Sequence, residues 1–209
     1  MDDLSDASIV EALRRGDAGA FDRAYERYHA RVYAFLLRLS GRREIADDLL
    51  QETWIKLARH ATTLREDTNL VAYLFTLARN AYRSFRRWAW LDSTRVDAYS
   101  GETSWIDAVT PEAAVEARRR HVMLERALFA LSAADREVLL LVGVEGMAQD
   151  EAAMVLGIEH AAMRKRVTRA RDRLAAKLEE MPNPRMPGAI GRRSVISVPP
   201  RSTAAYPSV

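Results

Sequence analysis

The chain of 209 residues contains no cysteine, so it can form no disulfide and offers no thiolate ligand to a metal. It has only four histidines, His29, His60, His121 and His160, and their positions show no spacing typical of a metal site. We therefore expect no metal and no other cofactor.

Long apolar runs are also missing, since no stretch approaches the roughly 20 residues that cross a bilayer. The first residues, 1–6, are acidic rather than apolar, unlike a secretory signal. We therefore expect a cytoplasmic protein with no membrane partner, and the lack of cysteine is compatible with that reducing compartment.

What is present is a globular composition with unevenly placed charge. A hydrophobic content of 48% and a charged content of 29% are typical of a folded chain with a strongly charged surface. The net charge is only +3, yet basic residues gather at 79–87 and 164–173, whereas residues 47–52 are acidic. Different surfaces of the protein should therefore meet partners of different charge.

Apolar residues that recur at three- and four-residue steps predict helices in most of the chain. Asp, Ser and Gly residues interrupt this pattern in the middle, and prolines interrupt it at the end. Pro111 suits the first position of a new helix, and Ser132 suits the cap of another. The sequence thus predicts an all-α protein with a helical domain at 1–88, a flexible linker at 89–110, a second helical domain at 111–180 and a flexible tail at 181–209.

The second domain has the pattern of a helix-turn-helix motif. Two helices, 149–156 and 160–179, are separated by a break at Gly157, and the second helix is basic. Met163 and Val167 begin the apolar face of this second helix, so its polar side chains should point outward. We predict that duplex DNA contacts Arg164, Lys165, Arg166, Thr168, Arg169 and Arg173. The alternative is an ordinary solvated face of a packing helix.

A second basic face is predicted on the helix that begins at Leu70. Its stripe contains Tyr73, Thr76, Asn80, Arg83 and Arg87, flanked by Arg79 and Arg86. Aromatic rings stack on exposed bases while guanidinium groups hold phosphates, so this face suits DNA that is partly unpaired. A charged surface without a nucleic-acid ligand is the alternative.

The acidic face of the helix predicted over 44–60 consists of Asp47, Asp48, Gln51 and Glu52. Carboxylates can serve metal binding or acid–base catalysis, but no histidine, glycine-rich loop or nucleophile accompanies them. We therefore expect no enzyme activity, and we interpret the face as a docking surface for a basic protein.

The order of these segments resembles the extracytoplasmic-function (ECF) branch of the bacterial sigma-70 family, over residues 8–178. The resemblance lies in the segments 13–25, 45–54 (IADDLLQETW), 73–80 (YLFTLARN), 135–141 (DREVLLL) and 145–174. It implies that the acidic face binds the clamp helices of the polymerase β′ subunit. It also implies that the 73–87 helix, with Asn69 and its preceding loop, opens and recognises the -10 promoter element, and that the helix-turn-helix recognises the -35 element.

The partners implied by the resemblance are core RNA polymerase and promoter DNA, duplex and single-stranded, with an anti-sigma factor as a further candidate. Three residues depart from the family pattern. Ala148 and Glu159 stand where Ser or Thr often caps the two helices of the motif, and Ala162 replaces a common threonine. We expect weaker or altered contacts to the -35 element as a result.

Two other interpretations fit parts of this pattern. One is a two-domain helix-turn-helix regulator that binds duplex DNA without being a polymerase subunit, and the other is an RNA-binding helical protein. Neither requires both the acidic docking face and the basic face at 79–87, so the combination favours the sigma factor.

Overall fold

The computed structural model of the protein describes residues 5–91 and 112–181, and within these ranges every regular element is a helix, as predicted. The predicted linker and tail fall almost wholly outside the described residues. The first domain contains α1 (Asp6–Arg14), α2 (Ala18–Ser40), α3 (Arg43–His60), the 3-10 turn η1 (Ala61–Thr63) and α4 (Leu70–Leu91). The second contains α5 (Glu112–Phe129), α6 (Ala133–Leu139), the π-helical turn η3 (Leu140–Val144), α7 (Gln149–Leu156) and α8 (His160–Glu180).

Local capping contacts set the ends of the first helices. The side chains of Ser5 and Asp17 accept hydrogen bonds from backbone N–H groups in the first turns of α1 and α2. α2 ends at Gly41, whose φ of 74° is a left-handed conformation that favours glycine. The Asn69 side chain caps α4 by accepting a backbone N–H at 2.9 Å. α4 then continues to Leu91, past the expected end of the first domain at residue 88.

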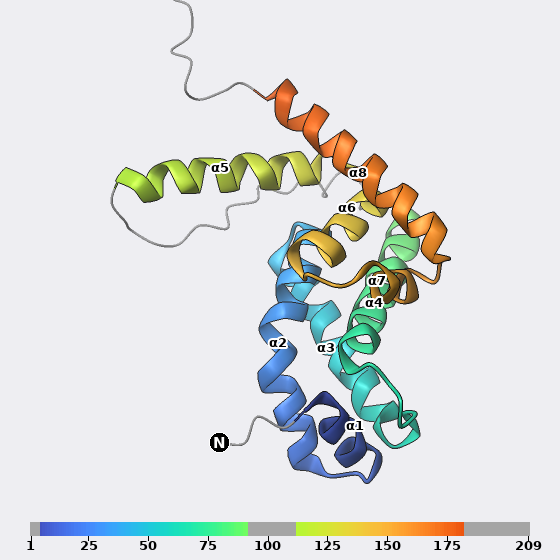
Figure 1. Cartoon of the computed structure of the whole chain (residues 1–209). Helices are drawn as coiled ribbons and strands as arrows, with labels where there is room; N and C mark the ends of the chain where they lie inside the picture. Colours follow the sequence, from blue (N-terminus) through green and yellow to red (C-terminus); the bar gives the residue numbers. More distant parts are fainter. Residues whose placement is uncertain (1–4, 92–111, 182–209) are drawn as a thin grey trace, which may run out of the picture.

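α2, α3 and α4 lie side by side as a bundle, and α1 packs against the end where α2 begins (Figure 1). Their apolar stripes face each other, so Phe35, Leu57 and Phe75 are fully buried. The rings of Phe35 and Phe75 meet edge to face, with centroids 5.1 Å apart. The helical spacing of apolar residues therefore produces a core along the whole bundle.

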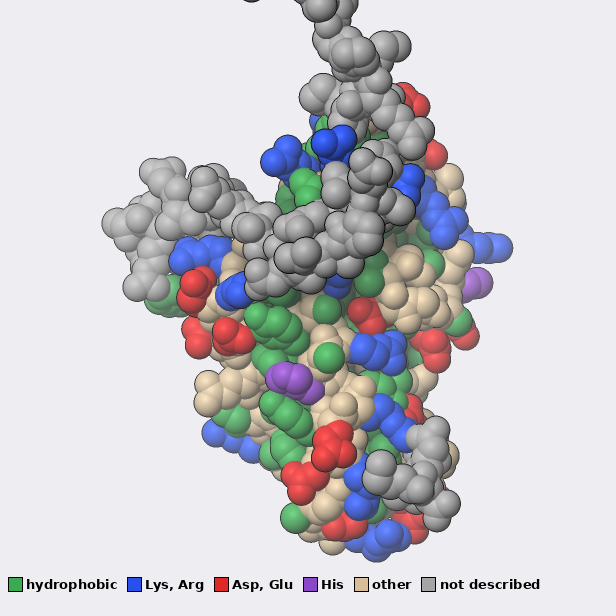
Figure 2. Space-filling view, turned by 90° about the vertical axis from the view of Figure 1, so that its left-hand side faces the viewer, with side chains coloured by type: hydrophobic (Ala, Val, Ile, Leu, Met, Phe, Trp, Pro, Cys, Tyr) green, Lys and Arg blue, Asp and Glu red, His purple; other side chains and the backbone are tan. Residues whose placement is uncertain are grey.

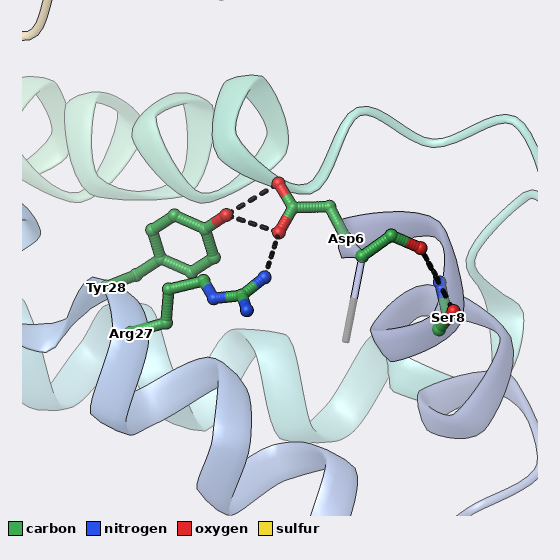
Figure 3. Close-up of polar contacts among 5 residues, drawn as sticks. Asp6, Ser8, Arg27 and Tyr28 are labelled. Carbon is green, nitrogen blue, oxygen red and sulfur yellow. Dashed lines mark hydrogen bonds and ion pairs between the residues drawn. The ribbon is translucent and has the colours of Figure 1, made fainter. Parts of the chain in front are cut away.

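A polar contact ties α1 to α2 (Figure 3). The Asp6 carboxylate accepts hydrogen bonds from the Tyr28 hydroxyl and, at 2.9 Å, from Nη1 of Arg27. Burial, helped by the hydrogen bond to Asp6, raises the pKa of Tyr28 to about 12. The hydroxyl therefore remains protonated and keeps donating to Asp6 well above neutral pH.

The second domain contains the predicted helix-turn-helix motif. α7 ends at Gly157, which has a φ of 61°, and α8 follows directly. Met163, Val167 and Ala170 of α8 are buried, so the predicted inward face is confirmed. α8 packs on both α6 and α7, and its opposite face is exposed.

The two domains pack against each other in the described part of the chain. α7 lies against α4, and α6 lies against α2 (Figure 1). Their buried apolar residues form one continuous core, which reaches from α1 to α8. The second domain is therefore held on the first by direct contact and does not depend on the linker alone for its position.

We predict that Tyr28→Phe lowers the free energy of unfolding by about 1 to 2 kcal/mol at pH 7, because it removes a hydrogen bond to a carboxylate. In the unfolded chain the Tyr28 phenol has its ordinary pKa of 10.0, whereas in the folded chain its pKa is about 12. The wild type should therefore lose its advantage over the variant as the pH rises through this window. Urea unfolding at a series of pH values measures both effects, and equal stabilities at pH 7 would contradict the assignment.

Candidate functional site

The outer face of α8 presents a row of basic and polar side chains. All six predicted DNA contacts on this helix are exposed: Arg164, Lys165, Arg166, Thr168, Arg169 and Arg173. Arg173 is also paired with Asp135 of α6, with Nη1 2.7 Å from a carboxylate oxygen. The structure therefore brings together a continuous basic surface, in which Arg173 is held in place by a neighbouring helix.

The caps of the motif are weak, as expected from the residues at these positions. Ala148 and Glu159 are the N-cap residues of α7 and α8, and neither side chain makes a capping hydrogen bond. Glu151 compensates in part, since its carboxylate accepts the backbone N–H of Ala148 at 3.1 Å. α8 therefore begins without side-chain capping.

The basic face of α4 is only partly accessible. Asn80, Arg83, Arg86 and Arg87 are exposed, whereas Tyr73 and Thr76 are half-buried. The guanidinium of Arg86 lies over the ring of the buried Tyr82, 5.9 Å from its centroid. The accessible part of the predicted -10 surface therefore consists mainly of these four exposed residues at the C-terminal half of α4.

The two remaining residues of this set, Arg79 and Asn69, bind side chains of the second domain. Arg79 is buried, with Nε 3.0 Å from the Glu137 carboxylate and Nη1 3.3 Å from the carbonyl of Val155. The Asn69 amide nitrogen donates to Glu151 at 2.9 Å. The periodicity of the sequence places Arg79 beside the exposed arginines of α4. Its burial depends on Glu137, which lies 58 residues further along the chain and cannot be recognised from that periodicity.

On α3, Asp47, Asp48 and Gln51 are exposed, and Glu52 is half-buried and paired with Lys56. Asp47 and Gln51 border an open groove of about 440 Å³ between α2 and α3. Its remaining lining is largely apolar and consists of Phe21, Tyr25, His29, Leu50, Trp54, Ile55 and Ala58. Figure 2 shows the side of the molecule on which α2 lies, where hydrophobic side chains gather around a histidine with acidic side chains nearby.

Sequence reasoning missed this groove, because it treated Trp54 only as a core residue. Trp54 is indeed buried, but its ring lies 4.9 Å from that of Tyr25, which is 40% exposed. The Trp54 indole N–H is buried and finds no acceptor among the described residues. The groove thus combines exposed apolar surface with an acidic rim.

A buried arginine joins the ends of helices from both domains. Arg136 of α6 donates to the carbonyls of Leu128, Phe129 and Leu131 and, at 3.1 Å, to that of Leu39 at the end of α2. Burial lowers its pKa from the usual value for arginine. One guanidinium therefore satisfies carbonyl groups at the end of α5 and at the end of α2.

A second contact between the domains involves a nearly buried carboxylate. Arg31 of α2 donates from Nε to Glu145, 3.1 Å away, and the Glu145 side chain is only 6% exposed. Burial raises the pKa of Glu145, and the hydrogen bond from Arg31 lowers it only in part. The ionised carboxylate is therefore less favourable here than in water.

Within the described ranges no group of three or more histidine, aspartate or glutamate side chains is arranged to hold a metal ion. In the same residues, none of the helices has both the length and the apolar character needed to span a lipid bilayer.

Family comparisons agree with an arrangement of two helical domains. The family model of Sigma-70 region 2 matches residues 24–91, and that of Sigma-70 region 4 matches residues 121–174. The RNA polymerase sigma factor NccH of Alcaligenes xylosoxydans xylosoxydans is 33% identical, over 84% of this chain and 98% of that protein. CarQ of Myxococcus xanthus, also an RNA polymerase sigma factor, is 31% identical, over 82% of this chain and 97% of that protein.

Solved structures agree with the fold. The sigma factor RpoE of Bartonella quintana, in complex with the anti-sigma factor NepR, has a TM-score of 0.63 and 27% identity, covering 78% of this chain and 98% of that one. Two helical domains that match regions 2 and 4 define a sigma factor of the reduced, two-region type. The chain belongs to the ECF branch of the sigma-70 family of RNA polymerase sigma factors.

We predict that the stability of the wild type rises relative to that of Glu145→Gln as the pH falls from 7 toward about 4. A carboxyl with a raised pKa in the folded chain takes up its proton before the unfolded chain does, which favours folding. The thermal midpoints of both proteins, measured across this pH range, give the difference in their stability. That difference would not change with pH if Glu145 were fully solvated.

Proposed function

We propose that this ECF sigma factor contacts its partners through three separate surfaces of the chain. The α3 face and its groove bind the clamp helices of polymerase β′, the α4 face recognises the -10 element, and the α8 face recognises the -35 element. The protein directs core polymerase to specific promoters and helps to open them, while the enzyme activity belongs to polymerase. The chain itself has no catalytic role in this proposal and acts in the cytoplasm, with the polymerase and the chromosome.

The observation that carries this proposal is the separation of charge between the surfaces. Asp47, Asp48 and Gln51 are exposed on one face of α3, while the exposed arginines of α4 and α8 lie on other helices. An acidic surface repels nucleic acid, so it suits a protein partner, and the basic surfaces suit phosphates. A regulator that binds duplex DNA alone has no need of the acidic surface.

The groove next to the acidic face adds affinity to this docking surface. Tyr25 and Ile55 are 40% and 42% exposed, which leaves apolar area for a partner helix to cover. The rim carboxylate of Asp47 gives that helix a charge preference. A helix with basic and apolar side chains on one face would satisfy all of these groups.

The deciding experiment is transcription in vitro with purified core polymerase and a library of promoter sequences. A sigma factor makes initiation depend on its presence and selects a subset of promoters. Tight binding to duplex DNA without association with core polymerase would instead support the two-domain regulator.

We predict that Asp47→Arg with Asp48→Arg weakens binding to core polymerase at least tenfold while the helical content stays unchanged, because the docking face becomes repulsive. The matched control is Glu11→Arg with Glu66→Arg, which makes the same change of charge at exposed carboxylates away from α3. Circular dichroism and a polymerase pull-down test both proteins. Unchanged affinity in the folded α3 variant would remove the docking assignment.

We also predict that Lys165→Ala with Arg169→Ala reduces transcription about tenfold or more from promoters that have a -35 element, and much less from promoters that lack it. The control is Arg171→Ala with Lys177→Ala, which removes one exposed and one half-buried positive charge from the same helix. Equal losses for both kinds of promoter, or for both double variants, would mean that α8 contributes only general attraction to phosphates.

A further inference from the structure

The groove between α2 and α3 holds apolar side chains between two acidic edges. Tyr25 on the α2 wall and Ile55 on the α3 wall are 40% and 42% exposed. The carboxylate of Asp47 borders the α3 edge. On α2, Asp22 is exposed and precedes Tyr25 by three residues, so it lies on the same side of that helix. A ligand that fits this groove therefore carries apolar side chains with a positive charge on either side of them.

The sequence that follows α8 has this composition. Residues 182–209 contain four arginines and no aspartate or glutamate. The apolar run 195–198 (VISV) stands between Arg192 and Arg193 on one side and Arg201 on the other. Two prolines follow the run directly and disfavour a helix, so we expect it to bind in an extended form. Alternate side chains of an extended segment point the same way, which would place Ile196 and Val198 on one side.

This segment is long enough to reach the first domain. The described chain ends at Met181, directly after α8, and the 14 residues 182–195 lead from there into the apolar run. Fully extended, they span about 46 Å. α8 has 21 residues and is about 32 Å long, and it packs on α7, which in turn lies against α4. The segment can therefore run back along the whole of α8 to the helices of the first domain.

We propose that residues 192–201 bind the groove between α2 and α3 as a ligand supplied by the same chain. Ile196 and Val198 pack on the apolar wall, and the arginines on either side of them lie beside the acidic edges. A tethered ligand has an effective concentration on the order of 1 mM, so even weak contacts in the groove are populated.

The inference rests on the proposed function of α3, because polymerase uses the same groove in that proposal. The run and the partner helix share one chemistry, apolar side chains with positive charge, so they compete for one site. Core polymerase must displace the run before it docks, and the tether thereby lowers the apparent affinity of the free protein for polymerase.

A cross-link tests where the run binds, because the natural chain has no cysteine. Ser197→Cys places a thiol in the middle of the run, and Ala58→Cys places another at an exposed position that lines the groove. A short bis-methanethiosulfonate reagent should join this pair within one chain. The control, Ser197→Cys with Ala162→Cys, uses an exposed alanine of α8, the helix that leads into the segment, and should be joined about fivefold less efficiently.

Two results of this cross-linking experiment would overturn the proposal. Equal yields for the groove pair and the control pair would mean that the run meets the groove only by random collision. Products that join two chains instead of one would assign the groove to a second copy of the protein.

Competition with polymerase is tested in the full chain. Ile196→Asp with Val198→Asp removes the apolar contact, so the affinity for core polymerase should rise about threefold or more. The matched control, Ala204→Asp with Ala205→Asp, adds the same charge outside the run and should leave the affinity nearly unchanged. Titration of labelled core polymerase measures both, and an unchanged affinity or an equal rise in the two variants would contradict the competition.

The acidic edge is tested without polymerase. Asp47→Arg with Asp48→Arg, added to the groove cysteine pair, should reduce the cross-link yield severalfold, because the arginines beside the run are then repelled. An unchanged yield in this protein, with its helical content intact by circular dichroism, would contradict the charge pairing. If the groove pair is joined as expected but core polymerase binds none of these proteins, the proposed function of α3 is wrong and the contact within the chain stands.

Discussion

The buried ion pair between Arg79 and Glu137 constrains how the two domains can pack, together with the apolar core that they share. Both side chains are at most 10% exposed, so their charges have lost most of their water and must satisfy each other. Removing one partner would leave a buried charge uncompensated, so each of the two residues requires the other as long as the domains are packed together.

The three charged surfaces share one small helical scaffold, in which two residues of the proposed -10 set, Asn69 and Arg79, bind the second domain. The bundle of α2, α3 and α4 places the acidic face and the proposed -10 face on different helices, and the α6–α8 unit carries the proposed -35 face. Their relation to one another is set by the shared apolar core and by polar contacts at the junction, among them those of Arg31, Arg79 and Arg136. Surfaces of opposite charge on separate helices suit a protein that contacts both an enzyme and a promoter.

Most of the fold was predictable because its signals are local. Ser5, Asp17 and Gly41 mark helix ends through capping contacts within a few residues, and Met163 and Val167 mark the inner face of α8 by their spacing. The burial of Arg79 and the groove beside Trp54 could not be predicted in this way. Both arise where helices distant in sequence meet, and periodicity on one helix does not show which neighbour covers it.

The hydrogen bonds of Arg136 are divided unequally between the two domains. Three of the carbonyls that it binds belong to its own domain, and only that of Leu39 belongs to the other. The carbonyl of Leu39, which α2 leaves without a partner at its C-terminal end, thus receives its donor from a residue 97 positions away in the chain. Loss of this one side chain would therefore leave carbonyls without a donor in both domains at once.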